Sequence, residues 1–329
     1  MRFFRRGPDS TGTPQEQAEE AERAERSRQL VEAGGIPVAA EERIAKHNQE
    51  GGVWTSDLSV DELAALRGVG YEPVAQVLGS SLYRVGWIGG WGMGPGLGGG
   101  IGVGGIYAYQ SMEPQENVAL TQALRDARNR ALHRLLLEAR GLGAEGVVGV
   151  RLAVRAWDWA QGMSEFTVLG TAVRRPGVQP PAEPFTSTLS GQDLAKLLSA
   201  GYFPTRLVMG VSAQQAVAVL GRGLGGYSAW FNQEMTPFSR AMHQAQAVAT
   251  QRLRLEAGEA AASGVVGVEF TNRVIEYPTG SEAVMGRIVE WVILGTAVVP
   301  RTGSPPLPKP LQVVSLNARR MADERPGTP

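Results

Sequence analysis

The chain repeats part of its own sequence, and this repetition constrains its fold more than any other feature. The pattern over residues 55–81 recurs 131 residues later, over residues 186–212, without a gap. Two shorter motifs also return: Gly-Val-Val-Gly-Val at 146–150 and 264–268, and Leu-Gly-Thr-Ala-Val at 169–173 and 294–298. The sequence therefore predicts two copies of one module of roughly 115 to 125 residues, a usual size for a domain.

Composition excludes several classes of function. The 329 residues are 43% hydrophobic and 19% charged, enough for two buried cores plus tails. The 32 Lys and Arg residues balance the 32 Asp and Glu residues, so we expect no nucleic-acid partner. The absence of cysteine excludes disulfides, thiolate metal sites and a cysteine nucleophile. The basic N-terminus is followed by acidic residues and not by an apolar segment, which predicts a cytoplasmic location without a secretory signal.

Prolines, glycines and charges divide the chain into five parts. Residues 1–54 predict a charged helical arm and linker, with one helix at about 14–33 and a second around 39–46. The remaining parts are module 1 at 55–175, a proline-rich linker at 176–184, module 2 at 185–301, and a proline-rich tail at 302–329 that we expect to be disordered.

Each module predicts the order helix, strand, helix, strand, strand, which is an α+β fold. Ser59 and Ser190 open the first helices as capping residues. Alanines spaced four residues apart on each long helix form a smooth stripe suited to close packing. We expect a mainly antiparallel sheet covered on one face. The expected strands are 74–82, 147–154, 166–173, 205–211, 265–270 and 288–299, and the expected long helices are 114–141 and 237–260.

The repeated motifs resemble those of a known family. Glu138-Ala139, followed by the Gly-Val-Val-Gly-Val and Leu-Gly-Thr-Ala-Val motifs, is similar to the YbjQ-like family, often labelled a putative heavy-metal-binding domain. Glu256-Ala257 and the returning motifs extend the resemblance to module 2. It implies a small α+β subunit similar to the dodecin subunit, and single-module members that form pentameric rings. Module 2 departs from the pattern where Leu142-Gly-Ala-Glu145 becomes Ala260-Ala-Ala-Ser263.

The family label directs attention to acidic residues that both modules share. One carboxylate per motif would bind a divalent ion only weakly unless oligomer symmetry gathered several copies. The three histidines occupy positions that the modules do not share. We therefore expect no cofactor, with a metal as an alternative. The weak candidate ligands are Glu138, Glu256, Glu165 and Glu290.

Enzymatic chemistry finds no support in the repeat. No Ser, His and Asp arrangement, carboxylate pair or lysine recurs in both modules, so we predict that the chain is not an enzyme.

An uncharged, glycine-rich segment at residues 85–112 interrupts module 1. Glycine contributes little transfer energy and is a poor helix former, so a flexible apolar loop is favoured over a membrane span. Module 2 has a shorter relative of this segment. The apolar residues expected to form subunit contacts are Trp87, Ile88, Trp91, Leu97, Ile101, Tyr227 and Trp230.

These observations favour a non-enzymatic, oligomer-forming protein of two YbjQ-like modules. Small single-sheet modules gain buried area by joining edges. A closed ring of two-module chains needs an even number of modules, which makes five chains with ten modules a natural hypothesis. Two alternatives stay open: a metal- or small-molecule-binding protein with sites at subunit contacts, and a membrane-associated scaffold that uses residues 85–112 and the charged N-terminal helix.

Overall fold

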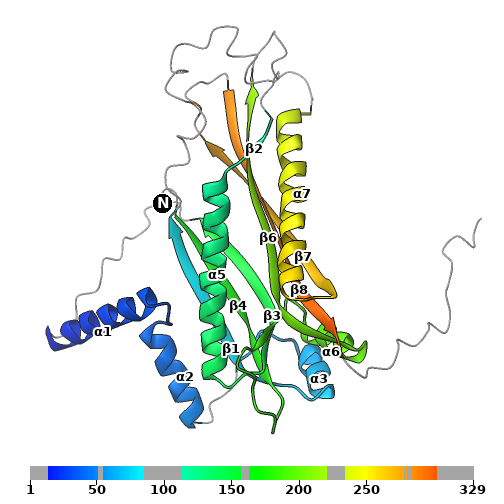
Figure 1. The fold of residues 1–329 in the computed structure, drawn as a ribbon. Coiled ribbons are helices and arrows are strands. Elements are labelled where there is room, and N and C mark those ends of the chain that lie inside the picture. Colours follow the sequence, from blue (N-terminus) through cyan, green and yellow to red (C-terminus); the bar gives the residue numbers. More distant parts are fainter. Residues whose placement is uncertain are drawn as a thin grey trace, which may run out of the picture.

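Two four-stranded sheets, each with a long helix packed on it, make up most of the described chain (Figure 1). The computed structural model describes residues 14–50, 55–84, 113–156, 163–220, 234–277, 279 and 284–301. The predicted α+β class is confirmed. The expected tail and the predicted contact residues, which are those of segment 85–112 together with Tyr227 and Trp230, lie outside the described residues.

The first half, defined as residues 55–175, has the predicted order of elements, with one additional short strand before the long helix. Strand β4 is central, because it pairs antiparallel with both β1 and β3. The three long strands predicted for this half are confirmed, each somewhat longer than expected. The elements are α3 (Val60–Gly68), β1 (Glu72–Arg84), β2 (Gln115–Glu116), α5 (Val118–Gly141), β3 (Gly146–Ala156) and β4 (Met163–Arg174).

The second half, defined as residues 185–301, repeats this arrangement. Strand β8 is central between β6 and β7, and both pairings are antiparallel. Strand β6 continues beyond its predicted end at 211, because residues 212–219 all have partners on β8. The elements are β5 (Phe185–Thr186), α6 (Gly191–Ser199), β6 (Tyr202–Val219), α7 (Thr236–Glu259), β7 (Gly264–Tyr277) and β8 (Val284–Pro300).

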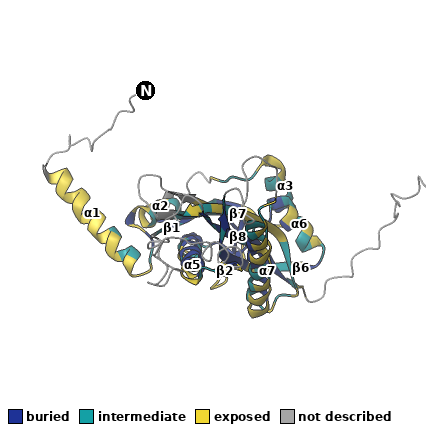
Figure 2. Cartoon of the chain, turned by 90° about the horizontal axis from the view of Figure 1, so that it is seen from above, coloured by how far each residue is buried: buried dark blue, intermediate teal, exposed yellow. Residues whose placement is uncertain are grey.

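Two helices precede the first half. Helix α1 (Pro14–Glu32) confirms the predicted charged helix, and nearly all of it is exposed (Figure 2). Helix α2 (Val38–Glu50) is longer than the segment predicted at 39–46. It packs against the end of α5, where Asn48 donates a hydrogen bond to the carbonyl oxygen of Gly141 at 3.0 Å. Ile44 of α2 is buried in the main core, so this helix is more than a linker.

The long helices approach their sheets closely because a glycine on each sheet faces the alanine stripe. A Cβ atom added to Gly79 would lie 1.9 Å from the carbonyl oxygen of Ala131. In the second half, a Cβ on Gly210 would lie 1.8 Å from the oxygen of Ala249. Both alanines are fully buried, which confirms the predicted packing role of the stripe.

The two halves exchange short strands. Strand β2 of the first half pairs antiparallel with β6, and β5 of the second half pairs parallel with β3. The sheet orders are therefore β1-β4-β3-β5 and β2-β6-β8-β7. The prediction that a helix begins at 114 is wrong, because residues 115–116 hydrogen-bond to another strand and α5 begins at Val118.

The main hydrophobic core spans both halves. Leu120 and Leu124 of α5 belong to the same buried cluster as Met209 and Ala213 of β6. Helix α5 therefore packs on its own sheet through the alanine stripe and on the second sheet through another face. The first capping box is formed as predicted, with Ser59 accepting a hydrogen bond from the Glu62 amide.

Candidate assembly interface

Strand β5 closes one edge of the first sheet. The Phe185 amide donates to the carbonyl oxygen of Glu145 at 3.1 Å, and the Ser187 amide donates to that of Val147 at 2.9 Å. In return, the Val150 amide donates to the Ser187 oxygen at 2.9 Å. These backbone bonds join the halves in the way that β-augmentation joins separate proteins.

Aromatic rings fill the space behind β5. Phe185 covers Gly146 of β3, where a Cβ atom would lie 2.2 Å from the ring. Its ring packs edge-on against Tyr71 of the first half and Phe203 of the second, with centroids 6.1 and 5.5 Å away. The glycine is therefore required for the close approach of the two halves.

Beside these rings, the first half has a buried carboxylate that the second half lacks. Glu145 is buried and accepts hydrogen bonds from the Tyr71 hydroxyl at 3.0 Å and from Arg175 Nε at 2.9 Å. Burial and the Glu145 carboxylate both raise the pKa of Tyr71 above its ordinary value, so its hydroxyl stays a proton donor to Glu145 even in alkaline solution. The corresponding residue in the second half is Ser263, the departure noted in the sequence.

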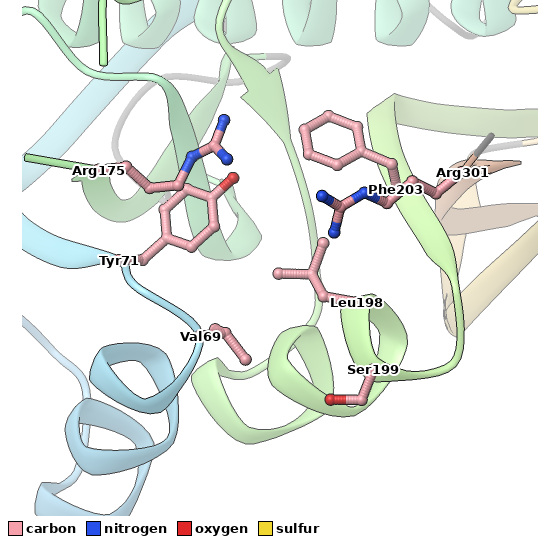
Figure 3. A pocket seen from close by; sticks show the side chains of 7 residues that line it. All are labelled: Val69, Tyr71, Arg175, Leu198, Ser199, Phe203 and Arg301. Carbon is pink, nitrogen blue, oxygen red and sulfur yellow. The ribbon is translucent and has the colours of Figure 1, made fainter. Parts of the chain in front are cut away.

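A pocket of about 440 Å³ lies where the halves meet. Tyr71 and Arg175 come from the first half, and Phe203 and Arg301 lie across from them (Figure 3). Two guanidinium groups and two aromatic rings give the pocket a cationic, partly apolar lining. Among the residues that the structure describes, the lining contains no His, Asp or Glu side chain that could act as a general base.

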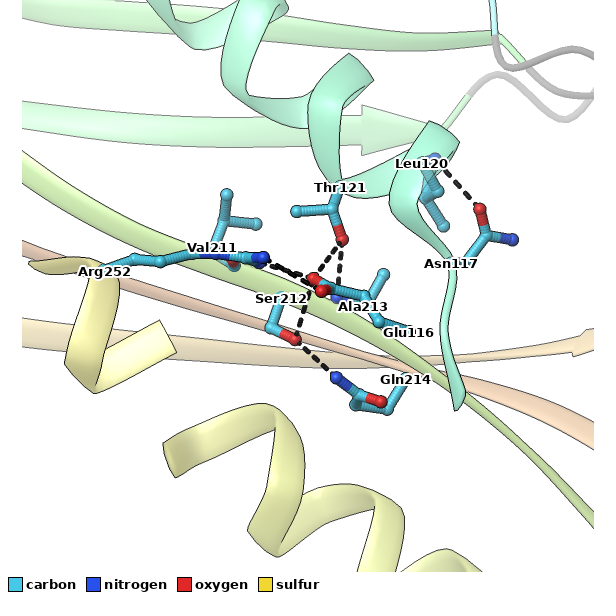
Figure 4. A network of polar contacts seen from close by, with 9 residues as sticks. All are labelled: Glu116, Asn117, Leu120, Thr121, Val211, Ser212, Ala213, Gln214 and Arg252. Atoms are coloured by element: carbon cyan, nitrogen blue, oxygen red, sulfur yellow. Dashed lines mark hydrogen bonds and ion pairs between the residues drawn. The ribbon is translucent and has the colours of Figure 1, made fainter. Parts of the chain in front are cut away.

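Strand β2 is fixed on the second sheet by a network around one carboxylate (Figure 4). Glu116 forms an ion pair with Arg252 of α7, whose Nη2 lies 2.9 Å from Oε2, and it accepts a hydrogen bond from Thr121 at 3.0 Å. Thr121 accepts in turn from the Ala213 amide at 3.1 Å. The Asn117 amide donates to the oxygen of Ala213 at 2.8 Å.

This network lowers the pKa of Glu116. Burial alone would raise the pKa, but the hydrogen bonds from Arg252, Thr121 and Ser212, with the charge of Arg252, outweigh that effect. The pKa therefore lies below the ordinary value of 4.5. The contact between β2 and β6 thus depends on an ionised carboxylate at neutral pH.

Two of the candidate metal ligands have matching structural roles. Glu138 accepts from the Leu78 amide at 3.0 Å, and Glu256 accepts from the Met209 amide at 3.3 Å, the corresponding position in the second half. Each also pairs with an arginine from outside its own half. Arg43 of α2 lies 2.5 Å from Glu138 Oε2.

The arginine at Glu256 comes from the first half. Arg128 Nη2 of α5 lies 2.8 and 2.7 Å from the two oxygens of Glu256. Arg128 is 7% exposed, so this ion pair is buried in the contact between the halves. These two glutamates therefore anchor a strand and a neighbouring helix in each half.

The other two candidates lie on the central strands. Glu290 is buried and forms an ion pair with Arg273, whose Nε lies 2.7 Å from Oε2. Glu165 is partly buried, 3.5 Å from the Thr167 hydroxyl. Within the described ranges, no three His, Cys, Asp or Glu side chains converge as a metal site would require. The structure therefore does not bring the four glutamates together within one chain.

The membrane alternative finds no candidate helix in the described part of the chain. None of the helices there is both long and apolar enough to cross a bilayer.

Comparison with known proteins identifies relatives for most of the chain. Encapsulin nanocompartment protein Rv1762c of Mycobacterium tuberculosis is 34% identical over 285 residues, which cover 83% of this chain and 95% of that protein. The chain belongs to the same family as this protein. Residues 109–175 also match the YbjQ family, described as "Putative heavy-metal-binding".

Shorter relatives match part of the chain. A UPF0145 protein of Hahella chejuensis is 49% identical over 53 residues, 16% of this chain and 49% of that protein. A UPF0145 protein of Thermus thermophilus is 50% identical over 54 residues, 16% of this chain and 46% of that protein. The resemblance stated from the sequence is thus confirmed for residues 109–175. No solved structure matches the chain.

Sequence reasoning missed the residues that join the halves. Gln115-Glu116 precedes α5 and Gln233-Glu234 precedes α7, and this shared pair was the available signal. Arg128 could not be identified from the repeat, because its counterpart in the second half is Gln246. The repeat can therefore reveal an interface residue that both halves keep, such as Glu116, but not one such as Arg128 that only one half carries.

Proposed function

We propose that the chain is a non-enzymatic assembly protein of two YbjQ-like modules, which correspond to the first and second halves. The observation that supports this proposal is the exchange of β2 and β5 between the halves. Each half contributes a strand to the other sheet, so a half on its own lacks part of its sheet. A module of this type is suited to association through its edges.

Self-assembly of whole chains follows from this construction. The contact between the halves uses different surfaces on its two sides, which makes it heterologous, and heterologous contacts build rings when their rotation closes. Five chains with ten modules remain our expectation for such a ring. We further propose that the chain acts in an encapsulin nanocompartment, which the name of its Mycobacterium tuberculosis relative gives for that protein, and that it does so in the cytoplasm.

Native mass spectrometry of the untreated full-length protein tests this proposal. One chain has a mass of 35.1 kDa, so an assembly is resolved from a monomer directly. We expect one dominant oligomer at micromolar concentration, without a retained metal ion or metabolite. A monomer at that concentration would contradict the proposal. A retained ion that is lost on mutation of Glu138 and Glu256 would instead support the metal-binding alternative.

A further inference from the structure

The contact between the halves could form a second time between two chains, because each residue of the contact has an equivalent position in the other half. The first half supplies Glu116 to Arg252 of the second half. In the alignment of the halves, Glu116 corresponds to Glu234 and Arg252 corresponds to Arg134. If a second half met another first half in the same way, Glu234 would lie at Arg134.

Within the described ranges, the first sheet has an exposed surface where the second sheet is covered. Met209 and Ala213 of β6 are 4% and 0% exposed beneath α5. Their counterparts on β1 are Leu78 and Leu82, which are 39% and 52% exposed. Strand β1 is also an edge strand, whereas β2 covers the corresponding edge of β6. Exposed leucines beside an open strand edge are typical of an interaction surface.

Arg134 lies at this surface, and no carboxylate among the described residues forms an ion pair with it. Its guanidinium donates to the carbonyl oxygen of Ser80, just as Arg252 donates to that of Val211 at 2.8 Å. Burial, with a smaller contribution from the positive charge of Arg130, lowers the pKa of Arg134. A partly buried cation of this kind gains from an arriving carboxylate.

The second half presents the complementary group. Glu234 is exposed immediately before α7, and its carboxylate contacts no cation in the described ranges. On α7 itself, a groove of about 390 Å³ is lined by residues that include Gln246 and Thr250. These two are the counterparts of Arg128 and Leu132, both of which lie on α5, the helix that covers the second sheet.

In the described part of the chain, no strand pairs with the far edge of the second sheet, which is β7. At Gly146 of β3, the ring of Phe185 fills the space beside the backbone, but nothing lies closer than 3.8 Å to a Cβ placed on Gly264 of β7. Val268 and Phe270 of β7 are 51% and 69% exposed.

Helix α2 already occupies the end of this surface next to Glu138. Arg43 supplies to Glu138 the positive charge that Arg128 supplies to Glu256. The arriving half is therefore expected to dock on the other end of the surface, around Arg134. With α2 in place, Leu82 at the other end of the surface is still exposed.

We infer that the second half of one copy docks on the first half of another, with Glu234 of one chain pairing with Arg134 of the next. The inference rests on the proposed self-assembly and specifies its partner, its surfaces and its central ion pair. The contact is heterologous and repeats the geometry already present within the chain.

A charge exchange tests the ion pair. Glu234→Arg places like charges at the contact and should raise the dissociation constant for assembly at least about tenfold. Arg134→Glu should do the same, and the two changes together in one chain should restore assembly. Glu259→Arg, an equal change in charge at the exposed end of α7, serves as the control and should leave assembly unchanged. The measurement is light scattering over a dilution series, with circular dichroism to verify folding.

The outcomes separate this inference from the proposed function. An oligomer that is unaffected by Glu234→Arg overturns the inference but leaves self-assembly intact. A wild-type monomer overturns both. Because Arg134→Glu alone could disturb the fold, the decision rests on Glu234→Arg, whose side chain is exposed.

Cysteine cross-linking tests the register, since the natural chain has no cysteine. Glu116 lies opposite Gln214 in the pairing of β2 with β6, so Glu234 should lie opposite Tyr83 of another copy. Opposed strand residues have Cα separations that a disulfide can span. Glu234→Cys with Tyr83→Cys should give covalent multimers on oxidation. Glu234→Cys with Glu72→Cys, at the other end of β1, should not. Equal cross-linking of both pairs would contradict the register.

Discussion

Strands β3 and β7 carry the same Gly-Val-Val-Gly-Val sequence in different surroundings. Both strands have the same irregularity, with a positive φ of 63° at Gly149 and 59° at Gly267. Val150 on β3 is 1% exposed, whereas its counterpart Val268 on β7 is 51% exposed. The local sequence therefore determines the strand and its bulge, whereas the burial of its side chains depends on whether a neighbouring half is present.

The largest expected difference in stability between the halves concerns the arginines that pair with Glu138 and Glu256. Arg128→Ala removes a buried guanidinium and leaves Glu256 without its cation, so the free energy of unfolding should fall by about 3 kcal/mol. Arg43→Ala should cost only about 1 kcal/mol, because the Arg43 side chain is 55% exposed and water can replace it.

Urea unfolding of the purified variants measures both costs. Arg125→Ala, an exposed change on the same helix, is the control for Arg128→Ala and should leave the midpoint unchanged. Equal losses for Arg128→Ala and Arg43→Ala would show that α2 holds the first half as firmly as α5 holds the second.

A smaller difference is expected at the two equivalent valines of β3 and β7. Val150→Ser removes buried methyl groups and buries a hydroxyl, which should cost about 2 kcal/mol. Val268→Ser should cost less than about 0.5 kcal/mol, because the site is half exposed. Both should be measured in the Glu234→Arg background, in which we expect separate chains. A large cost for Val268→Ser there would mean that β7 is covered within the single chain.

The sequence was sufficient to predict what each half builds for itself. The capping box at Ser59, the long helices and the central strands follow from local patterns and were confirmed. The ends of elements were less well predicted where a distant segment decides them. Glu116 has helix-compatible neighbours, yet it lies in a strand because β6 pairs with it and Arg252 binds its carboxylate.

The candidate site was predicted less well for the same reason. Glu138 and Glu256 were identified because both halves keep them, but the sequence could not show that arginines bind both. Arg43 and Arg128 lie on helices with no common motif, so only the three-dimensional arrangement brings them to equivalent positions. Comparing the halves finds shared structure efficiently and overlooks residues that make the halves different.

The smallest expected effect is the acid sensitivity of the network at β2. The pKa of Glu116 is lowered in the folded chain, so its stabilising contribution is complete above the ordinary carboxylate pKa and is lost as the pH falls through the lowered value. Glu116→Gln should therefore be less stable than the wild type at pH 7, and the difference should shrink below about pH 4.5. Thermal unfolding between pH 3 and 7 measures this convergence, with Glu259→Gln as the exposed control. A difference that stays constant down to pH 3 would mean that the ionisation of Glu116 does not contribute to the stability of the folded chain.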